Sequence, residues 1–175
     1  MYRPFTFMFT IATDRFNNET WEASYQYRTR RGIPCIYAPP CRIASSIAIH
    51  SPVFVIEMNN STNQIIGIGL IKNKIVTDRI YKVQPDTNYN RYIYIGHHHL
   101  TREILNNYNP YLVYVLEQIL FKGYTHSKRG AGITRLSEKV LKLDICKDIQ
   151  IKKEIRDIFI KHFKREEMFE SKVIN

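Results

Sequence analysis

The sequence is poor in the residues that would build a disulfide framework, a low-complexity chain or a membrane span. Three of its 175 residues are cysteine, an odd number without a framework spacing, so a reducing compartment is the simpler prediction. Glycine and proline contribute only seven residues each, which argues against a low-complexity chain. No apolar run reaches the roughly 18 residues that a spanning helix needs. We therefore expect a soluble intracellular protein without a membrane partner.

Acidic residues are also scarce relative to basic ones. The chain has 16 Asp and Glu against 26 Lys and Arg, a formal net charge of +10 and a pI near 9.6. This balance favours anionic partners, nucleic acid first and membrane headgroups second, although a basic surface without a specific ligand remains the alternative. The acids of the first half, Asp14 and Glu57 among them, form no cluster of the kind that a two-metal nuclease needs. Glu57 lies in the apolar run VFVIEMNN, either at a solvent-facing strand end or partly buried against a cation.

Recognised catalytic, nucleotide and metal motifs are missing as well. The segment around Gly123 lacks the Gly-Lys-Ser/Thr ending of a phosphate-binding loop, and no GxSxG or papain-like signature occurs. The run His97-His98-His99 would place only its first and third side chains on one strand face, and the other histidines lack ligand spacing. The sequence therefore predicts no metal site and no cofactor, and it gives no positive sign of an enzyme.

Runs of apolar and β-branched residues predict a β-rich part at residues 1–96. Residues 5–12, FTFMFTIA, alternate with a period of two. The clearest element is a hairpin of residues 53–58 and 64–71 around a polar Asn/Ser/Thr loop. Further strands are expected at residues 35–38, 79–83 and 91–95.

The glycines of the second hairpin strand leave one of its faces bare. Gly67 and Gly69 are two residues apart and so lie on the same face. A bare face suits either a sharp bend at the corner of a barrel or the close approach of another backbone or a ligand. Together with the strand pattern, it favours a small antiparallel β-barrel or strongly curved sheet.

Capping signals predict helices around and after this β-rich part. Asn17 or Asn18 can cap a helix at residues 19–31, which ends in arginines before Gly32. Asn109-Pro110 opens a helix in PYLVYVLEQILF. Ser137 can cap a short helix, and a longer one is expected at residues 148–169. The whole chain, 1–175, is therefore predicted to be one α+β domain whose helical part spans residues 100–175 and ends in a C-terminal helix.

The stretch FKGYTHSKRGAGITRL, residues 121–136, is too glycine-rich for mid-helix and too polar for core. Glycines let backbone N–H groups converge on an anion, and neighbouring cations add charge. An anion-binding loop is one interpretation, and a turn whose cations face water is the other. The candidate phosphate contacts in it are His126, Lys128, Arg129, Gly130 and Arg135.

The predicted helix at residues 19–31 carries both aromatics and arginines. Stacking surfaces beside cations are the means by which proteins hold single-stranded nucleic acid. Trp21 or Tyr25, four residues apart on one face, would stack a base, while Arg28, Arg30 and Arg31 would contact phosphate. The alternative is that Trp21 belongs to the core and the tyrosines are half-buried packing residues.

Five segments of the chain read DRFNNETWEASYQYR, CIYAPP, FVIEMNNSTNQIIGIGLIKN, YNRYIYIG and FKGYTHSKRGAGIT. Together they resemble a protein family of nucleocytoplasmic large DNA viruses, a family that carries no assigned activity. The resemblance covers Asp14 to Thr134, and where the family usually shows Lys-Tyr-Arg-Ile this chain has His-His-His-Leu at residues 97–100. A more distant likeness is to the PUA-type domains of the EVE and YTH kind, small β-barrels that hold a modified or flipped base in an aromatic pocket.

These observations and the resemblance lead to three functional expectations. The first is a viral nucleic-acid-binding domain that recognises single-stranded, modified or flipped bases of DNA or RNA through a basic, aromatic-lined face. The second is a structural or virion-packaging protein that meets viral protein partners. The third is a nuclease or nucleotide-modifying enzyme. The resemblance places the protein in the host cytoplasm or viral factory, or packaged in the virion.

Overall fold

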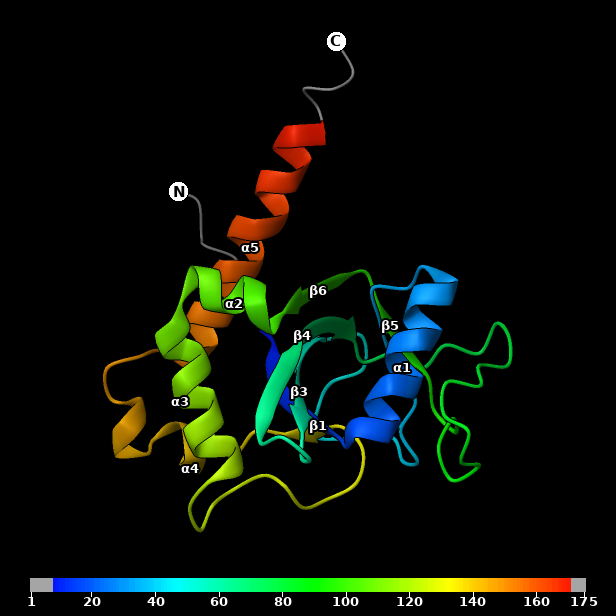
Figure 1. The fold of residues 1–175 in the computed structure, drawn as a ribbon, viewed down its shortest axis with the longest axis horizontal. Helices are drawn as coiled ribbons and strands as arrows, with labels where there is room; N and C mark the ends of the chain where they lie inside the picture. Colours follow the sequence, from blue (N-terminus) through cyan, green and yellow to red (C-terminus); the bar gives the residue numbers. More distant parts are fainter. Residues whose placement is uncertain (1–7, 171–175) are drawn as a thin grey trace.

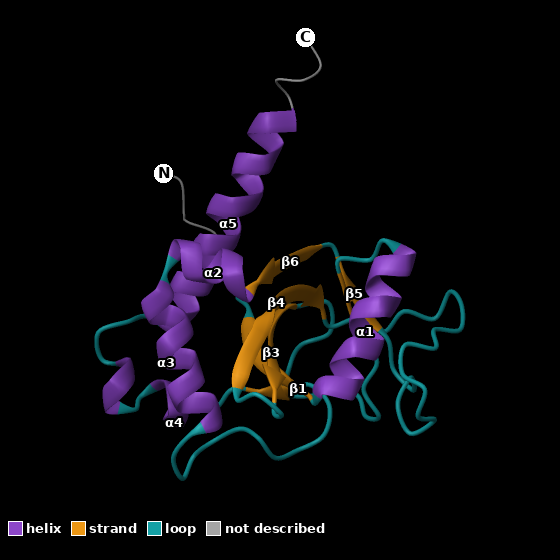
Figure 2. Ribbon diagram, viewed as in Figure 1, coloured by secondary structure: helices purple, strands orange, loops and turns teal. Residues whose placement is uncertain are grey.

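The computed structural model describes residues 8–170, which form an α+β fold (Figures 1 and 2). The strands are β1 (Thr10–Phe16), β2 (Cys35–Tyr37), β3 (Pro52–Asn59), β4 (Gln64–Lys72), β5 (Tyr94–Gly96), β6 (His98–Thr101) and β7 (Thr134–Arg135). The helices are α1 (Asn18–Arg31), α2 (Arg102–Tyr108), α3 (Pro110–Phe121), α4 (Glu138–Leu141), the 3₁₀ turn η1 (Asp144–Cys146) and α5 (Ile151–Glu170).

The strands that the structure describes form two sheets. The larger has the order β6-β4-β3-β1-β7, and the smaller pairs β2 with β5. β1 runs parallel to β3, while β3–β4, β4–β6 and β1–β7 are antiparallel. A parallel pair needs a crossover connection, and here α1, β2 and the following loop supply it.

The larger sheet is buried on both faces. Along β3, Phe54, Ile56 and Met58 point into the core that α2–α5 cover, whereas Val53 and Val55 point into a second core. The alternation is the period of two that a strand imposes. α1, β2, β5 and the loop after β2 cover the second face. Since Glu57 follows Ile56, its side chain lies on that second face as well.

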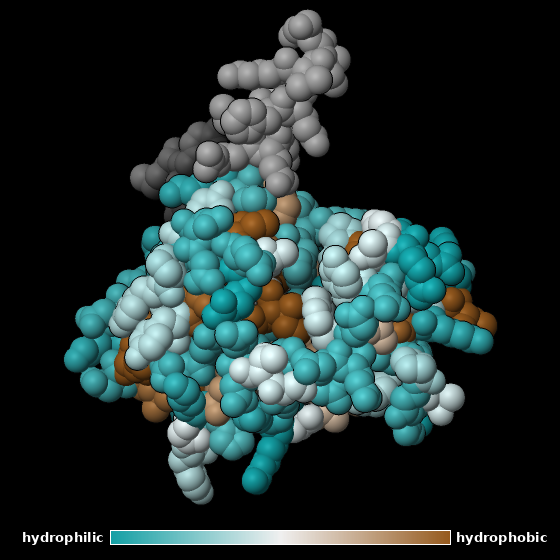
Figure 3. Space-filling model, viewed as in Figure 1, coloured by the Kyte–Doolittle hydropathy of each residue, from teal (hydrophilic) through white to brown (hydrophobic). Residues whose placement is uncertain are grey.

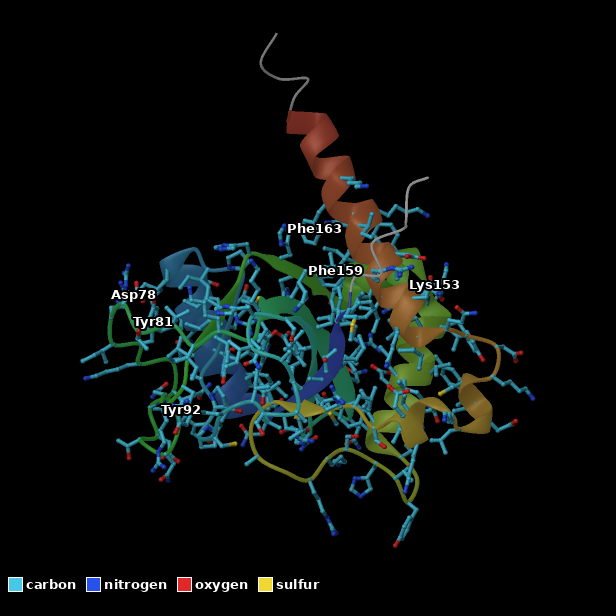
Figure 4. The ribbon with its side chains drawn as sticks, turned by 180° about the vertical axis from the view of Figure 1, so that it is seen from behind. Asp78, Tyr81, Tyr92, Lys153, Phe159 and Phe163 are labelled. Carbon is cyan, nitrogen blue, oxygen red and sulfur yellow. The ribbon has the colours of Figure 1, made fainter. Side chains whose placement is uncertain are left out.

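The helices form where local signals start and stop them. The Asn17 side chain accepts a hydrogen bond from the Thr20 N–H at 2.8 Å, and Gly32 ends α1 at a φ of +62°. The Asn109 side chain caps α3, which has Pro110 in its first turn. Figure 4 labels Phe159 on α5, whose ring meets that of Phe54 edge-to-face at 4.9 Å and fastens α5 to the sheet. No helix of residues 8–170 is long and apolar enough to cross a membrane.

The expected barrel or strongly curved sheet is wrong. The described strands form an open mixed sheet, with β6 at one edge and β7 at the other. Local pattern identified the strands but not the parallel β1–β3 pairing, which joins residues about forty positions apart. The bare face of Gly67 and Gly69 is not a barrel corner, because other side chains fill it as described below.

Individual strand boundaries also differ from the sequence prediction. Part of the strand expected at residues 5–12 lies outside the described residues, and β1 runs from Thr10 to Phe16. Residues 79–83 are loop rather than strand. In that loop the Tyr81 hydroxyl donates to Asp78 at 2.8 Å, a local contact seen at the edge of the molecule in Figure 4. β6 was not expected as a separate strand.

Candidate functional site

Two carboxylates lie side by side on the second face of the sheet. Asp14 of β1 is opposite Glu57 of β3 in the parallel register, and neighbouring strands are about 4.8 Å apart. Glu57 is 0% exposed and Asp14 is 9% exposed. Buried carboxylates are uncommon unless they are paired or functional, so this part of the sheet is the natural place to search for a site.

Glu57 is surrounded by three partners from three other elements. Arg28 of α1 lies with Nη2 2.9 Å from Oε1, and the Tyr37 hydroxyl of β2 donates to the same oxygen at 2.8 Å. His99 of β6 places Nε2 2.9 Å from the other carboxylate oxygen. Both oxygens are therefore satisfied, and Arg28, itself 6% exposed, is paired with a charge rather than with solvent.

The glycines of β4 make room for this cluster. β4 lies between β3 and β6, so the His99 ring must cross β4 to reach Glu57; a Cβ on Gly67 would lie 3.0 Å from that ring. A Cβ on Gly69 would overlap the Tyr37 hydroxyl. Side chains from β2 and β6 thus occupy the bare face that the sequence predicted, which is the close-approach interpretation of the glycine pair.

The partners decide the charge of Glu57. Burial alone would raise the pKa of this carboxyl, but the charges of Arg28 and His99 and the hydrogen bonds from His99 and Tyr37 lower it to about 2. The hydrogen bond between Glu57 and His99 Nε2 fixes the orientation of the imidazole ring. His99 Nδ1 has no hydrogen-bond partner in the described part of the chain, so it is available to a ligand.

A groove of about 530 Å³ runs beside α1 and exposes part of this cluster. Trp21, Tyr25 and Arg28 line it from α1, and Ile66 and His99 line it from the sheet. The face drawn in Figure 3 is the one seen in Figure 1, and hydrophobic residues show at its centre, between α1 and the pair α2 and α3. The buried Arg28 Nε has no hydrogen-bond partner among the described residues.

Asp14 faces a second, smaller space of about 110 Å³, here called the Asp14 pocket. Its lining comes from β1, the start of α1, the loop after β2, the loop before β5 and the glycine-rich segment. Four separate parts of the chain, residues 14–20, 38–40, 84–89 and 130–132, therefore meet here. The lining residues are Asp14, Arg15, Phe16, Thr20, Ala38, Pro39, Pro40, Gln84, Tyr89, Gly130, Ala131 and Gly132.

Arg15 organises the glycine-rich segment that walls this pocket. Its Nε donates to the Ser127 carbonyl at 2.5 Å, one terminal nitrogen donates to the Gly132 carbonyl at 3.2 Å and the other to the Thr134 hydroxyl at 2.8 Å. Gly130, at a φ of +117°, lies over the same guanidinium. The segment therefore turns carbonyl oxygens towards a cation of β1. The segment is therefore a pocket wall that Arg15 holds in place. The sequence suggested an anion-binding loop or a turn whose cations face water, and this structural role is a third possibility.

Asp14 has weaker support than Glu57. Burial raises its pKa to about 6, against the opposing effects of the Arg15 N–H, which donates to Oδ1 at 2.9 Å, and the Arg15 charge. The neighbouring charge of Glu57 also contributes to this raised pKa. Oδ2 accepts no hydrogen bond from the described residues. Two adjacent carboxylates thus have pKa values displaced in opposite directions, a feature typical of functional sites.

The structure separates the cations predicted to contact phosphate into three groups. Arg28 lies in the wall of the groove, not on the basic surface. Arg30 and Arg31 are exposed at the end of α1, where Arg31, Lys82 and Arg30 surround a hollow beside Tyr27. The third group, in and after the glycine-rich segment, comprises Lys128, the exposed Arg129 and Arg135, and His126, whose Nδ1 accepts from the Lys128 N–H at 3.2 Å.

Sequence reasoning missed several residues of the site. Gln84 was not singled out, since glutamine is common and carries no local signal. Tyr37 and Tyr89 were considered only among the tyrosines that could stack bases or pack half-buried. His99 was considered only as a metal ligand. Within residues 8–170, no group of three or more His, Cys, Asp or Glu side chains is placed to hold a metal ion.

Comparison of the chain with protein-family models, with curated proteins and with solved structures gives no match.

Proposed function

We propose that the protein binds single-stranded nucleic acid along α1. The observation that carries the proposal is the groove beside α1, which has aromatic side chains in its wall and exposed cations at both ends of the helix. Base stacking on aromatics combined with backbone contacts to cations is a sequence-tolerant way to hold a single strand.

The two aromatics are placed to offer stacking surfaces. Trp21 is held edge-to-face by Phe16 at 5.4 Å, and Arg28 lies 4.9 Å from the centre of its ring. Tyr25 is 55% exposed, and its ring is 6.3 Å from that of Trp21. Trp21 is therefore a fixed, partly buried part of the groove wall. Tyr25 is the accessible ring on which a base can stack.

Cations lie at each end of this aromatic pair. At the start of α1, the turn of residues 60–63 contacts both the helix and the glycine-rich segment: the Asn18 N–H donates to Ser61, and Lys128 Nζ donates to Asn63. At the end of α1, Arg30 and Arg31 are exposed. A strand that passes over Tyr25 thus meets positive charge on either side, which supports binding of its phosphates.

The test is binding of fluorescent single-stranded DNA and RNA oligonucleotides over a range of salt concentrations. We expect log K to fall with log salt at a slope of about −3 to −5, which corresponds to roughly 4 to 7 neutralised phosphates. Replacing Lys128 and Arg129 together by alanine should weaken binding to all sequences alike and flatten the slope by about one unit for each lost contact. Tyr25→Ala should weaken binding by about 1–3 kcal/mol without changing the slope.

A matched control removes two cations from the opposite layer. Lys147→Ala with Lys153→Ala makes the same charge change, and both side chains are more than half exposed. If this control weakens binding as much as the Lys128 and Arg129 pair, general attraction explains the result and the α1 face is wrong. If neither DNA nor RNA binds at low salt, the proposal of nucleic-acid binding is wrong, and the virion-protein alternative becomes the better proposal.

A second candidate function is acid–base chemistry on the bound strand. The observation that favours it is His99, oriented by the ionised Glu57 and with Nδ1 unpartnered by any described residue, in a groove also lined by Arg28. The test is incubation with DNA and RNA without added metal. Turnover that His99→Gln abolishes, with oligonucleotide affinity retained, would establish this function, and no turnover would leave binding alone.

A further inference from the structure

We propose that the Asp14 pocket binds one unstacked base of the strand and selects guanine by the two adjacent N–H donors of its Watson–Crick edge. The inference rests on the proposed function, because the strand along α1 supplies the base. It adds a site and a specificity that stacking in the groove does not provide.

The pocket contains hydrogen-bond acceptors that lack donors. Gln84 is 7% exposed; its Nε2 donates to the Thr20 carbonyl at 2.9 Å, while the buried Oε1 has no partner within the described chain. Asp14 has a free Oδ2 beside its Arg15-bound Oδ1. Buried acceptors are normally paired, so the unpaired Gln84 Oε1 beside the free Asp14 Oδ2 indicates a ligand that donates hydrogen bonds.

The walls of the pocket combine ring surfaces with polar groups. Phe16, Pro39, Pro40 and Tyr89 supply rings, and the Gly130–Gly132 backbone closes another side. An apolar cavity of about 150 Å³ holds a benzene molecule. A space of about 110 Å³ that opens to the surface therefore suits the edge and part of the rings of a base, not a whole nucleotide.

The charge around the pocket argues against a cationic ligand. The Arg15 guanidinium lines it, and Lys128 and Arg129 belong to the segment that walls it. A lysine or arginine side chain of a partner protein would meet repulsion from these groups on entry. A neutral donor edge carries no such penalty, and an attached phosphate would be attracted by the same cations.

The donor pattern then selects among the bases. Adenine and cytosine each present one amino group on the Watson–Crick edge, and uracil and thymine present one imino group. Guanine presents an imino and an amino N–H side by side, which a carboxylate can accept together, with Gln84 as a further acceptor. The match of two donors to Asp14 is the reason for choosing guanine.

The pocket is connected to the proposed binding face. Phe16 forms one wall of the pocket and also holds Trp21, which lines the groove. Thr20, in the first turn of α1, lines the pocket as well. A base can therefore enter the pocket while its neighbours along the strand lie over α1.

The experiment measures binding of GMP, IMP, AMP and CMP by calorimetry. IMP is the sharpest comparison, since hypoxanthine differs from guanine only in lacking the 2-amino group. We expect GMP to bind at least about tenfold more tightly than the other three, the discrimination that one good base-edge contact provides. Asp14→Asn, which replaces an acceptor oxygen by a donor, should abolish the preference. Gln84→Met should reduce it.

Asp86→Asn is the matched control, because Asp86 is an exposed carboxylate of the loop next to Gln84 and outside the pocket lining. It should leave the GMP preference unchanged. Equal binding of the four nucleotides, or a preference that survives Asp14→Asn in a folded protein, overturns the inference. Asp14-dependent binding of arginine amide in place of GMP also overturns it, because the pocket would then be a cation site.

The two proposals fail in distinguishable ways. Oligonucleotide binding with the expected salt slope but no preference for guanine removes only the pocket assignment. The absence of any oligonucleotide binding removes both.

Discussion

At the scale of single residues, two adjacent carboxylates behave oppositely because their partners differ. Asp14 and Glu57 share one sheet face and one register position on neighbouring strands. Glu57 is held by Arg28, His99 and Tyr37, whereas Asp14 has one backbone donor and a free oxygen. Burial is common to both, so the supply of partners decides which carboxylate is stable as an anion.

The first prediction concerns the stability cost of Asp14. Its folded pKa of about 6 lies above the ordinary value of 3.8, so the unfolded chain releases the proton first as the pH rises. The folded state is therefore penalised progressively between about pH 4 and pH 6, by at most about 3 kcal/mol above that window. Asp14→Asn should raise the free energy of unfolding at pH 8 and change it little at pH 4, as measured by urea titration. An equal effect at both pH values would show that the carboxylate carries no such penalty.

Glu57 gives the opposite pH dependence. Its folded pKa of about 2 lies below the ordinary 4.5, so its stabilisation is complete above pH 4.5 and is lost as the pH falls towards 2. Glu57→Gln leaves Arg28 buried without its counter-charge and should cost about 3–5 kcal/mol at pH 7. Urea titrations of both proteins should converge as the pH is lowered. A variant as stable as the wild type at pH 7 would contradict the ion-pair description.

At the scale of elements, β4 is built around the side chains that cross it. Gly67 allows the His99 ring to reach Glu57, and Gly69 leaves space for the Tyr37 hydroxyl. The β3–β4 register shifts between Glu57 and Met58, so the irregularity in the ladder lies beside the same cluster. The two glycines at alternate positions of β4 therefore leave the space in which polar side chains from β2 and β6 reach Glu57.

Gly69→Ala tests this role of β4. The added methyl would overlap the Tyr37 hydroxyl, which is fully buried, so we expect a loss of about 3 kcal/mol in the free energy of unfolding. Tyr37→Phe in the same protein should recover part of the loss, because it removes the overlapped oxygen. Gly123→Ala is the control: no atom lies within 4 Å of its Cβ, and only its φ of +77° opposes it, at about 1–2 kcal/mol. If Gly69→Ala lowers the free energy of unfolding no more than Gly123→Ala does, Gly69 is not needed to make space for Tyr37.

Local signals predicted α1, α3, α4 and α5 but not α2, and they predicted the sheet poorly. The Asn109 cap and Pro110 located α3, and Ser137 located α4, because capping depends on neighbours in sequence. The β1–β3 pairing and the edge strand β6 depend on contacts between distant segments, so the alternating pattern identified strands without their order. The same limit applies to the site: aromatics and cations of α1 were found by spacing, but Tyr37, His99 and Gln84 meet their partners only through the fold.

At the scale of the whole molecule, the sheet divides a structural layer from a candidate functional layer. α2–α5 pack on one face around Phe54 and Phe159, while the groove, the Asp14 pocket and α1 lie on the other. This separation predicts that stability and binding can be changed independently.

Phe159→Ala tests that separation. Phe159 is buried in the helical layer, so its truncation should cost about 3–5 kcal/mol. The affinity of the folded protein for oligonucleotides and for GMP should stay within about twofold of wild type at a temperature where the variant is folded, since no contact of the groove or pocket is removed. A large loss of affinity would show that the helical layer also shapes the binding face.

The attachment of the glycine-rich segment to β1 sets the moment at which the site first exists. Arg15 binds Ser127 and Gly132, and β7 places Thr134 beside Thr13. These partners of β1 are therefore synthesised more than a hundred residues after β1 itself. Chains are synthesised from the N-terminus at about 5–20 residues per second. The groove along α1 can form once the chain has reached Glu103, its last lining residue, but the Asp14 pocket is closed only when the segment up to β7 has been made. A nascent chain therefore cannot capture a base there, and specificity begins only once that segment has been synthesised.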